Sequence, residues 1–210
     1  MKLYFSPAAC SLAPHIVVYE AGLAAQTEII KVDLRSKTFT GGGDYFSVNP
    51  KGYVPALQLD DGTVLTEVAA IVQYLADRAP QTGLAPPSGT IARYQLQELL
   101  NFLATEIHKA WSPLWDKDTA EPQREAAQAK LDKRFNNLKT ALETQPFLMG
   151  NSYTVADAYL FTLANWGQWT GVDIARWPWI KAHYDRVKAR PAVVAAIAAE
   201  RASKLKSNPP

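Results

Sequence analysis

The chain is poor in cysteine, with Cys10 the only one among 210 residues. A single cysteine excludes an intrachain disulfide, so the fold does not depend on oxidation, which is compatible with a reducing compartment. The sequence also has no CxxC, HExxH, P-loop or GxGxxG motif. We therefore expect no resident metal.

Excess charge and long apolar runs are missing as well. The formal net charge is +2, and no run of Lys or Arg is interleaved with aromatic residues, which argues against a nucleic-acid partner. Pro7 interrupts the N-terminal segment before an apolar run develops, and no stretch is long enough to span a bilayer. We therefore expect a cytoplasmic globular protein without a membrane partner.

The first 80 or so residues mix strand and helix patterns. We expect strands at 2–5, 27–33, 54–59 and 63–65, and helices at 12–22 and 67–78. The order strand, helix, strand at the start favours a parallel pair with a right-handed crossover. The polar segment 36–44 holds three consecutive glycines, which predicts a mobile loop.

Prolines and glycines concentrate in residues 80–89, which predicts a linker. Everything after it has a helical period. We expect helices at 90–111, at 122–143, from 154, after 178 and at 192–199. The fold class is thus an α/β domain over 1–79, then an all-helical domain over 90–203 and a tail over 204–210.

Cys10 lies where the first strand leads into the first helix. Unpaired backbone N–H groups and the helix dipole favour the thiolate at such a position. The alternative is a small buried apolar residue. Ser11 is either a second group for the same substrate atom or a residue of the first helical turn.

Two further segments are suited to binding a peptide. Pro55 cannot donate to a strand ladder, and a cis Val54–Pro55 bond would leave the backbone of Val54 free to pair with an extended peptide, whereas an ordinary trans bond would not. Glu67 and the Val68 N–H open a helix, and such an end suits the two charges of an amino-acid head group. Alternatively, Glu67 only complements the helix dipole.

Asn101, Thr105 and His108 are spaced i, i+4, i+7 and so share one face of the long helix expected over 90–111. Either they face a cleft, where His108 would donate a proton near neutral pH, or the face is simply solvated. The segment from Thr154 to Asp157 is a capping box with a structural role.

Together these segments resemble the glutathione S-transferases, and most closely the bacterial beta class with an active-site cysteine. The resemblance covers nearly the whole chain. It rests on five segments: 7–11, 49–55, 65–77, 101–109 and 154–161. It implies a thioredoxin-like N-terminal domain, an all-helical C-terminal domain, a homodimer and glutathione as co-substrate.

The resemblance also implies roles for individual residues. Cys10 would lie against the glutathione sulfur and form a mixed disulfide with it. The implied contacts to the rest of glutathione are the Val54 backbone before a cis Pro55, Glu67 with the Val68 N–H, Lys37, Asn101, Thr105 and His108. The chain departs from the family at Val68, where Ser or Gly is usual, so a side-chain hydroxyl contact is lost.

Three functions compete. The first is conjugation of the glutathione thiolate to a hydrophobic electrophile, as in detoxification. The second is a glutathione-dependent reduction of disulfides or peroxides, with Cys10 as the nucleophile. The third is a non-catalytic protein of the same fold that binds glutathione or a hydrophobic ligand. Four tryptophans offer apolar surface for such a ligand, although core packing explains them equally well: Trp111, Trp115, Trp166 and Trp169.

Overall fold

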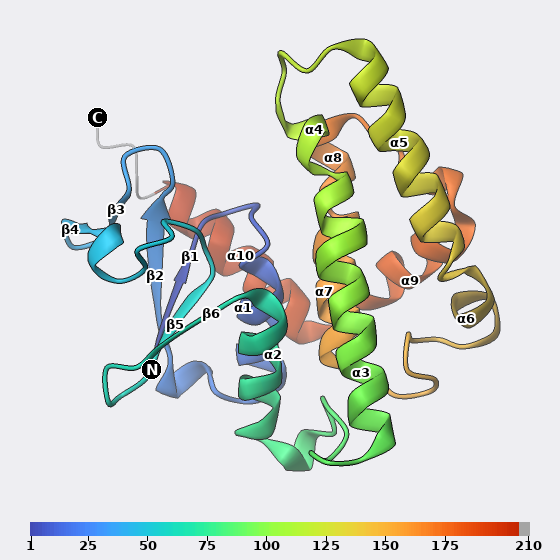
Figure 1. Cartoon of the computed structure of the whole chain (residues 1–210). Coiled ribbons are helices and arrows are strands. Elements are labelled where there is room, and N and C mark those ends of the chain that lie inside the picture. Colours follow the sequence, from blue (N-terminus) through green and yellow to red (C-terminus); the bar gives the residue numbers. More distant parts are fainter. Residues whose placement is uncertain (206–210) are drawn as a thin grey trace. The chain divides into compact units, whose positions relative to one another are not determined.

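The computed structural model describes residues 1–205, with side chains through 203, and it consists of two compact units (Figure 1). One unit holds residues 1–84 and the chain from Arg190 onward, and the other holds residues 85–189. We expected the helical domain to run to residue 203, but the chain from Arg190 onward belongs to the first unit. The last helix, α10 (Pro191–Leu205), packs along α1 (Leu12–Glu20) within the first unit.

An ion pair fixes this arrangement of the last helix. Arg190 Nη2 donates to Glu20 Oε2 at 2.8 Å, and Arg190 Nε contacts the other oxygen of the same carboxylate. The helix is also longer than the expected 192–199 and includes the first two residues of the expected tail. The remainder of that tail, 206–210, lies outside the described residues.

The first unit is built on a six-stranded sheet with the order β4-β3-β2-β1-β5-β6. The strands are β1 (Lys2–Phe5), β2 (Glu28–Asp33), β3 (Thr38–Phe39), β4 (Gly43–Asp44), β5 (Ala56–Gln58) and β6 (Val64–Thr66). The parallel pairing of β1 with β2 is confirmed, with Leu3 opposite Ile29. The other neighbouring pairs are antiparallel.

The prediction that residues 36–44 form only a loop is wrong, because the segment contains two short strands. Strands β3 and β4 form a short hairpin there that extends the sheet beyond β2. Phe39 anchors this hairpin. Its ring packs edge-on against Tyr4, with centroids 5.5 Å apart, and it contacts the buried apolar cluster that includes Tyr4 and Tyr45. One aromatic side chain thus anchors a segment whose composition otherwise indicates a loop.

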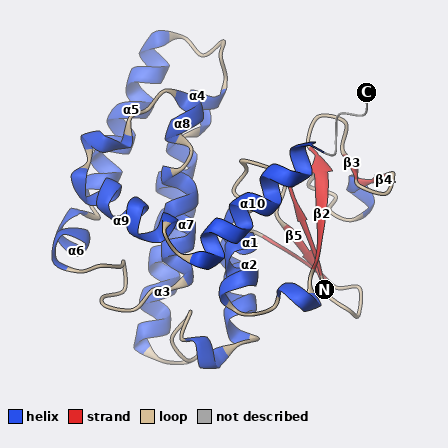
Figure 2. Cartoon of the chain, turned by 180° about the vertical axis from the view of Figure 1, so that it is seen from behind, coloured by secondary structure: helices blue, strands red, loops and turns tan. Residues whose placement is uncertain are grey.

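Helices α1, α2 (Val68–Asp77) and α10 lie beside the sheet in the first unit (Figures 1 and 2). Helix α1 packs against both α2 and α10. Its central residues Ile16, Val17 and Val18 are fully buried, so this helix is apolar on several sides rather than along one stripe. The residues just before α1 are therefore connected to a helix that lies in the buried core of the unit.

The second unit is helical. It comprises α3 (Ile91–Phe102), a π-helical segment (Leu103–His108), α4 (Ser112–Trp115), α5 (Glu121–Asn136), α6 (Lys139–Thr144), α7 (Val155–Ala164), α8 (Gly167–Thr170) and α9 (Pro178–Lys188). The expected helix over 90–111 changes to π geometry at Leu103, and the expected helix over 122–143 breaks between α5 and α6. Short α8 was not expected. Within residues 1–205, no helix has both the length and the apolar character of a membrane span.

The capping box before α7 is confirmed. Asp157 is fully buried, and its Oδ2 accepts a hydrogen bond from the Thr154 N–H at 2.8 Å. Its Oδ1 accepts from the Leu148 N–H at 2.9 Å and lies 2.9 Å from Nε2 of His183. Asp157 therefore joins the loop before α7 to α9, and the fully buried His183 has a structural role.

Candidate functional site

Cys10 directly precedes Ser11, the N-cap residue of α1, so its thiol lies at a helix N-terminus as expected. The side chain is partly buried. Its Sγ donates a hydrogen bond to the carbonyl oxygen of Val54 at 3.3 Å. The structure thus brings together Cys10 and Val54, which are 44 positions apart and which we identified as candidates from separate sequence features.

Ser11 has a different role from the catalytic one expected for it. The residue is fully buried. Its hydroxyl donates to the Ser6 carbonyl at 3.1 Å and accepts from the Ser6 N–H at 3.1 Å. Because both functions of the hydroxyl are used within the turn, it is not presented to a substrate. Ser11 closes the loop from Ser6 to Cys10 instead.

The Val54–Pro55 peptide bond is cis, which decides between the two alternatives that the sequence left open. The Val54 carbonyl accepts from Cys10. Among the described residues, the Val54 N–H has no hydrogen-bond partner. Val54 precedes β5, so this backbone is positioned to pair with an extended peptide next to the thiol.

Tyr45 and Asn49 support this backbone and were missed by sequence reasoning. Tyr45 Oη and Asn49 Nδ2 both donate to the Tyr53 carbonyl, at 2.8 Å and 2.7 Å. Tyr45 is fully buried, and desolvation by that burial raises its pKa to about 12. Tyr45 directly follows the polar segment 36–44, where no periodicity in the sequence marks it.

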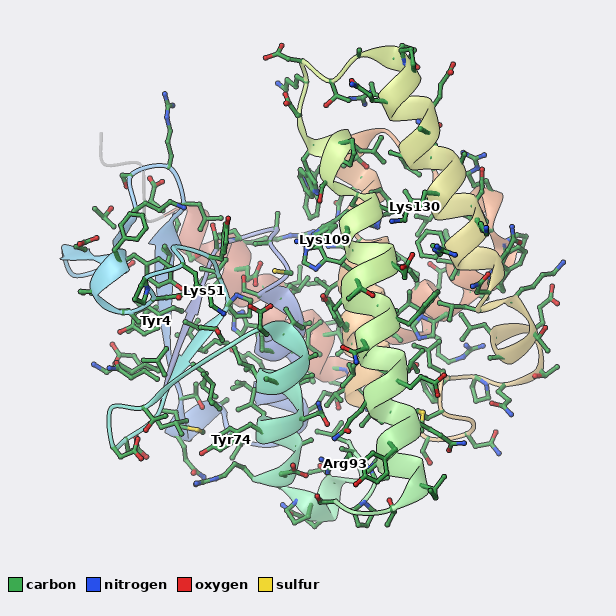
Figure 3. The ribbon with its side chains drawn as sticks, viewed as in Figure 1. Tyr4, Lys51, Tyr74, Arg93, Lys109 and Lys130 are labelled. Carbon is green, nitrogen blue, oxygen red and sulfur yellow. The ribbon has the colours of Figure 1, made fainter. Side chains whose placement is uncertain are left out.

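Glu67 is the N-cap residue of α2, with φ at 71° and ψ at 127°, a conformation that L-residues rarely adopt. Its carboxylate is exposed and pairs with Lys51, whose Nζ lies 3.2 Å from Glu67 Oε1 and donates to Thr66 Oγ1 at 3.1 Å. Figure 3 labels Lys51 in the first unit. Thr66 is the last residue of β6. The Val68 side chain is buried, so it does not cover the N-terminal end of α2. A strained backbone and an ammonium thus flank the N-terminal N–H groups of α2.

Lys37 has its backbone in the left-handed region, with φ at 57°. Its Nζ donates to the Gly52 carbonyl at 2.9 Å. It therefore reaches the segment that carries Lys51 and Tyr53. A lysine ammonium has three donors, so this bond does not exhaust its capacity.

The polar line expected on the second unit is broken by the π-helical segment. Thr105 is exposed and its hydroxyl donates to the carbonyl of Asn101, which is also exposed. His108 is partly buried, and its Nδ1 lies 2.7 Å from the Tyr159 hydroxyl on α7. A π turn contains more residues than an α turn, so His108 is rotated away from the other two. The solvated alternative therefore fits Asn101 and Thr105.

Aromatic rings surround His108 within the second unit. The Trp166 ring centroid lies 4.8 Å from that of His108, in an edge-on arrangement. Trp111 and Trp166 are buried and serve the core. Trp115 and Trp169 are 42% and 44% exposed and stack with centroids 6.3 Å apart. Core packing therefore explains Trp111 and Trp166. Of these four tryptophans, only Trp115 and Trp169 offer apolar surface to a ligand.

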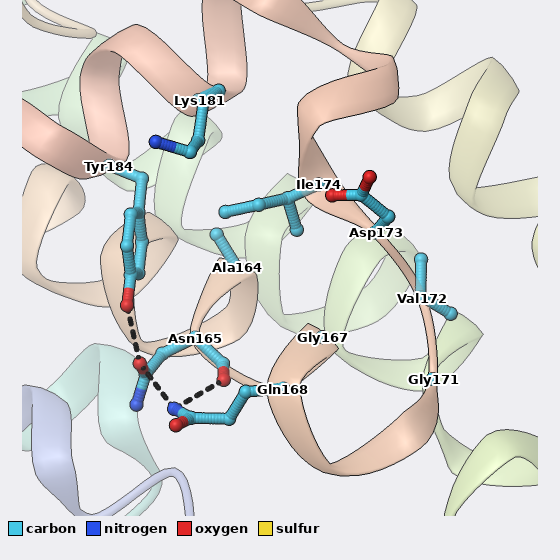
Figure 4. A pocket seen from close by; sticks show the side chains of 10 residues that line it. All are labelled: Ala164, Asn165, Gly167, Gln168, Gly171, Val172, Asp173, Ile174, Lys181 and Tyr184. Atoms are coloured by element: carbon cyan, nitrogen blue, oxygen red, sulfur yellow. Dashed lines mark hydrogen bonds between the residues drawn. The ribbon is translucent and has the colours of Figure 1, made fainter.

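A cavity of about 380 Å³ lies elsewhere in the second unit, where α7, α8 and α9 meet (Figure 4). Three of its polar side chains bond to one another: Asn165, Gln168 and Tyr184. Tyr184 Oη donates to Asn165 Oδ1 at 2.9 Å, and Gln168 Nε2 donates to the same oxygen at 2.7 Å. The described residues contain no group of three or more His, Cys, Asp or Glu side chains that could hold a metal ion.

Two family models match the chain. The model described as "Glutathione S-transferase, N-terminal domain" matches residues 8–78, and the one described as "Glutathione S-transferase, C-terminal domain" matches residues 102–191. The matched ranges contain Cys10, the cis proline, Glu67 and His108. The two models together cover most of the chain.

Individual relatives agree along nearly the whole length. Glutathione S-transferase GstA of Escherichia coli O157:H7 is 44% identical over 200 residues, which cover 95% of this chain and 98% of the relative. A sphingomonad glutathione S-transferase solved in complex with glutathione has a TM-score of 0.90 at 43% identity, covering 95% and 98% of the two chains. The beta-class enzyme of Sphingomonas chungbukensis has the same TM-score and coverage at 42% identity.

Proposed function

Because this chain belongs to the glutathione S-transferase family, in its bacterial beta class, we propose that it transfers glutathione to hydrophobic electrophiles and that Cys10 also carries a thiol–disulfide reaction. The observation that supports the second part is the 3.3 Å contact between Cys10 Sγ and the Val54 carbonyl beside the cis proline. It puts the thiol next to a backbone suited to an extended peptide.

Glutathione fits the groups of the first unit. The cysteinyl part of the tripeptide would pair with the backbone of Val54, next to Cys10 Sγ. The γ-glutamyl head group carries an ammonium and a carboxylate, which match the Glu67 carboxylate and the Val68 N–H at the start of α2. Lys37 supplies a positive charge to the glycyl end. We propose these contacts as the glutathione site.

The redox reaction balances with glutathione as the second thiol. The Cys10 thiolate attacks the glutathione sulfur of a mixed disulfide and forms a Cys10–glutathione disulfide, while the other sulfur leaves as a thiolate that takes up a proton. A second glutathione, as its thiolate, then attacks that disulfide. Oxidised glutathione leaves and the Cys10 thiolate is restored. The single cysteine of the chain makes this external thiol necessary.

The remaining proposals concern the second unit and the assembly. We propose that His108 takes part in the reaction and that the exposed Trp115 and Trp169 contact the hydrophobic electrophile. The proposed cytoplasmic location rests on the single-cysteine composition. A homodimer is supported by Ile91 and Tyr94, which are 73% and 59% exposed and lie i, i+3 on α3.

Replacing Cys10 by Ala tests the division of labour. Wild type and variant are assayed for conjugation of glutathione to an activated aryl halide and for reduction of a glutathione mixed disulfide. We expect reduction to vanish and conjugation to remain. Loss of conjugation to the same extent as reduction would show that Cys10 is needed for both reactions. If wild type shows neither activity, the chain is instead a ligand-binding member of the family.

A further inference from the structure

A buried carboxylate on the last helix reaches the loop that carries Cys10. Glu200 of α10 has a side chain that is only 7% exposed. Its Oε2 accepts a hydrogen bond from the Ala8 N–H at 3.3 Å, and its Oε1 lies 3.3 Å from Nδ1 of His15. All of these residues belong to the first unit, although Ala8 and Glu200 are 192 positions apart.

Ala8 is two residues before Cys10 and has φ at 70°, in the left-handed region that favours glycine. An alanine persists there only when its surroundings hold it. Ser6 and Ser11 close the ends of the turn, and the Ala9 N–H donates to the Ser6 carbonyl at 3.1 Å. Ala9 also packs against the apolar cluster that includes Val54. The bond from Ala8 to Glu200 ties the middle of this turn to α10.

His15 completes the arrangement. It is fully buried in α1, between the rings of Phe5 and Tyr19. Its Nε2 has no hydrogen-bond partner among the described residues, so Nδ1 is the nitrogen through which it is bonded, as the donor to Glu200. A buried carboxylate needs such donors. Glu200 is therefore held in place by His15 on one side and holds Ala8 on the other.

We propose that Glu200 is a positioning residue for Cys10. By accepting the hydrogen bond from the Ala8 N–H, Glu200 fixes the strained turn before α1. The turn in turn sets the direction from which Cys10 Sγ approaches the Val54 carbonyl. The C-terminal helix thereby controls the reactivity of a thiol near the other end of the chain. The importance of this control for catalysis rests on the function proposed for Cys10.

The chain offers a matched control. Glu20 is also a carboxylate with little exposure, 10%, and it also joins α1 to α10, through Arg190. Replacing Glu20 by Gln therefore weakens the same pair of helices without touching the loop. Because Cys10 is the only cysteine, alkylation by iodoacetamide reports on this thiol alone and requires no glutathione.

The experiment measures the rate of Cys10 alkylation from pH 5 to 9, and KM and kcat for glutathione, well below the unfolding temperature of each variant. For E200A we expect the midpoint of the pH–rate curve to move by at least half a pH unit and KM for glutathione to rise about fivefold or more. E200Q keeps an oxygen acceptor and should lie closer to wild type. E20Q should lower the unfolding temperature and leave the pH–rate curve in place.

A second substitution keeps the proposal testable if E200A folds poorly. Glycine adopts a φ of 70° without strain, so Ala8→Gly added to E200A or E200Q should move the pH–rate curve back toward wild type. The proposal is overturned if the curve of E200A superposes on wild type, if E20Q moves it equally, or if Ala8→Gly restores nothing. A shifted alkylation curve in a protein whose wild type lacks glutathione chemistry would support this inference while removing the proposed function.

Discussion

The thiol of Cys10 donates to the carbonyl of Val54 across 3.3 Å, which joins the start of α1 to the segment before β5. This contact has a measurable structural part. In Cys10→Ala the carbonyl loses its donor, and we expect the free energy of unfolding to fall by about 1 kcal/mol. In Cys10→Ser a hydroxyl donor remains, so the loss should be smaller. Denaturant unfolding measures both, and equal stability of the two variants would contradict a stabilising hydrogen bond.

Tyr45 should make stability depend on pH in the alkaline range. Its pKa rises from about 10 in the unfolded chain to about 12 in the fold, because burial disfavours the phenolate. The native state then binds more protons, so the stabilisation is complete below pH 10 and is lost as pH rises toward 12. We expect the free energy of unfolding to decrease over this interval by up to about 2 kcal/mol more in wild type than in Tyr45→Phe.

The comparison for Tyr45 needs a tyrosine without burial. Tyr53 is 72% exposed, and Tyr53→Phe should follow the wild-type curve between pH 10 and 12. Chemical unfolding at several pH values measures all three proteins. If Tyr45→Phe and wild type lose stability in parallel, the titration of Tyr45 does not contribute.

Glu67 should show a conflict between stability and binding. Glycine adopts a positive φ without cost, so Glu67→Gly is expected to raise the free energy of unfolding by about 1 kcal/mol. Glu67→Ala keeps the strained backbone and should give no gain. Both variants lose the carboxylate, and we expect KM for glutathione to rise about tenfold in each. A stability gain in the alanine variant as well would point to relief of charge rather than strain.

Asp157 should be among the most sensitive positions of the second unit. It is fully buried and accepts hydrogen bonds from two backbone N–H groups while it contacts His183. Asp157→Ala leaves those groups unpaired, and we expect a loss of about 3–5 kcal/mol in the free energy of unfolding. Asp185→Asn is the control, because Asp185 pairs with Lys181 on an exposed helix face and should cost under about 0.5 kcal/mol.

His108 separates catalysis from packing. Its Nδ1 contacts the Tyr159 hydroxyl, so Tyr159→Phe removes the same hydrogen bond without removing the imidazole. We expect His108→Ala to lower kcat by about tenfold or more, and Tyr159→Phe to lower it less. Thermal unfolding of both variants gives the structural cost. An unchanged kcat in His108→Ala would remove this residue from the mechanism.

Much of the first unit follows from local patterns. The β1, α1, β2 order follows from an apolar run, a turn with proline and a helical segment that is apolar on several sides, and these signals lie within the first 33 residues. The capping box at Thr154 is equally local, since the two partners are three residues apart. Such features are legible in sequence because both partners of each interaction are close in the chain.

Features that depend on distant partners were missed or misread. Phe39 orders the hairpin over 38–44 only because Tyr4 lies beneath it. Tyr45 was overlooked because its partner is a carbonyl eight residues away, in another turn. The π geometry at Leu103 has no sequence signature of its own, and it turned His108 away from Asn101 and Thr105.

By itself, the sequence determined which residue types are available for chemistry: one thiol, a proline that interrupts a strand, and an acid at a helix start. It determined the fold class for the same reason, since hydrophobic period and turn residues are properties of short segments. Only the tertiary structure decided how the thiol is held. The cis bond before Pro55, the closure of the turn by Ser11 and the reach of Glu200 to Ala8 join segments whose contacts exist only in the packed chain.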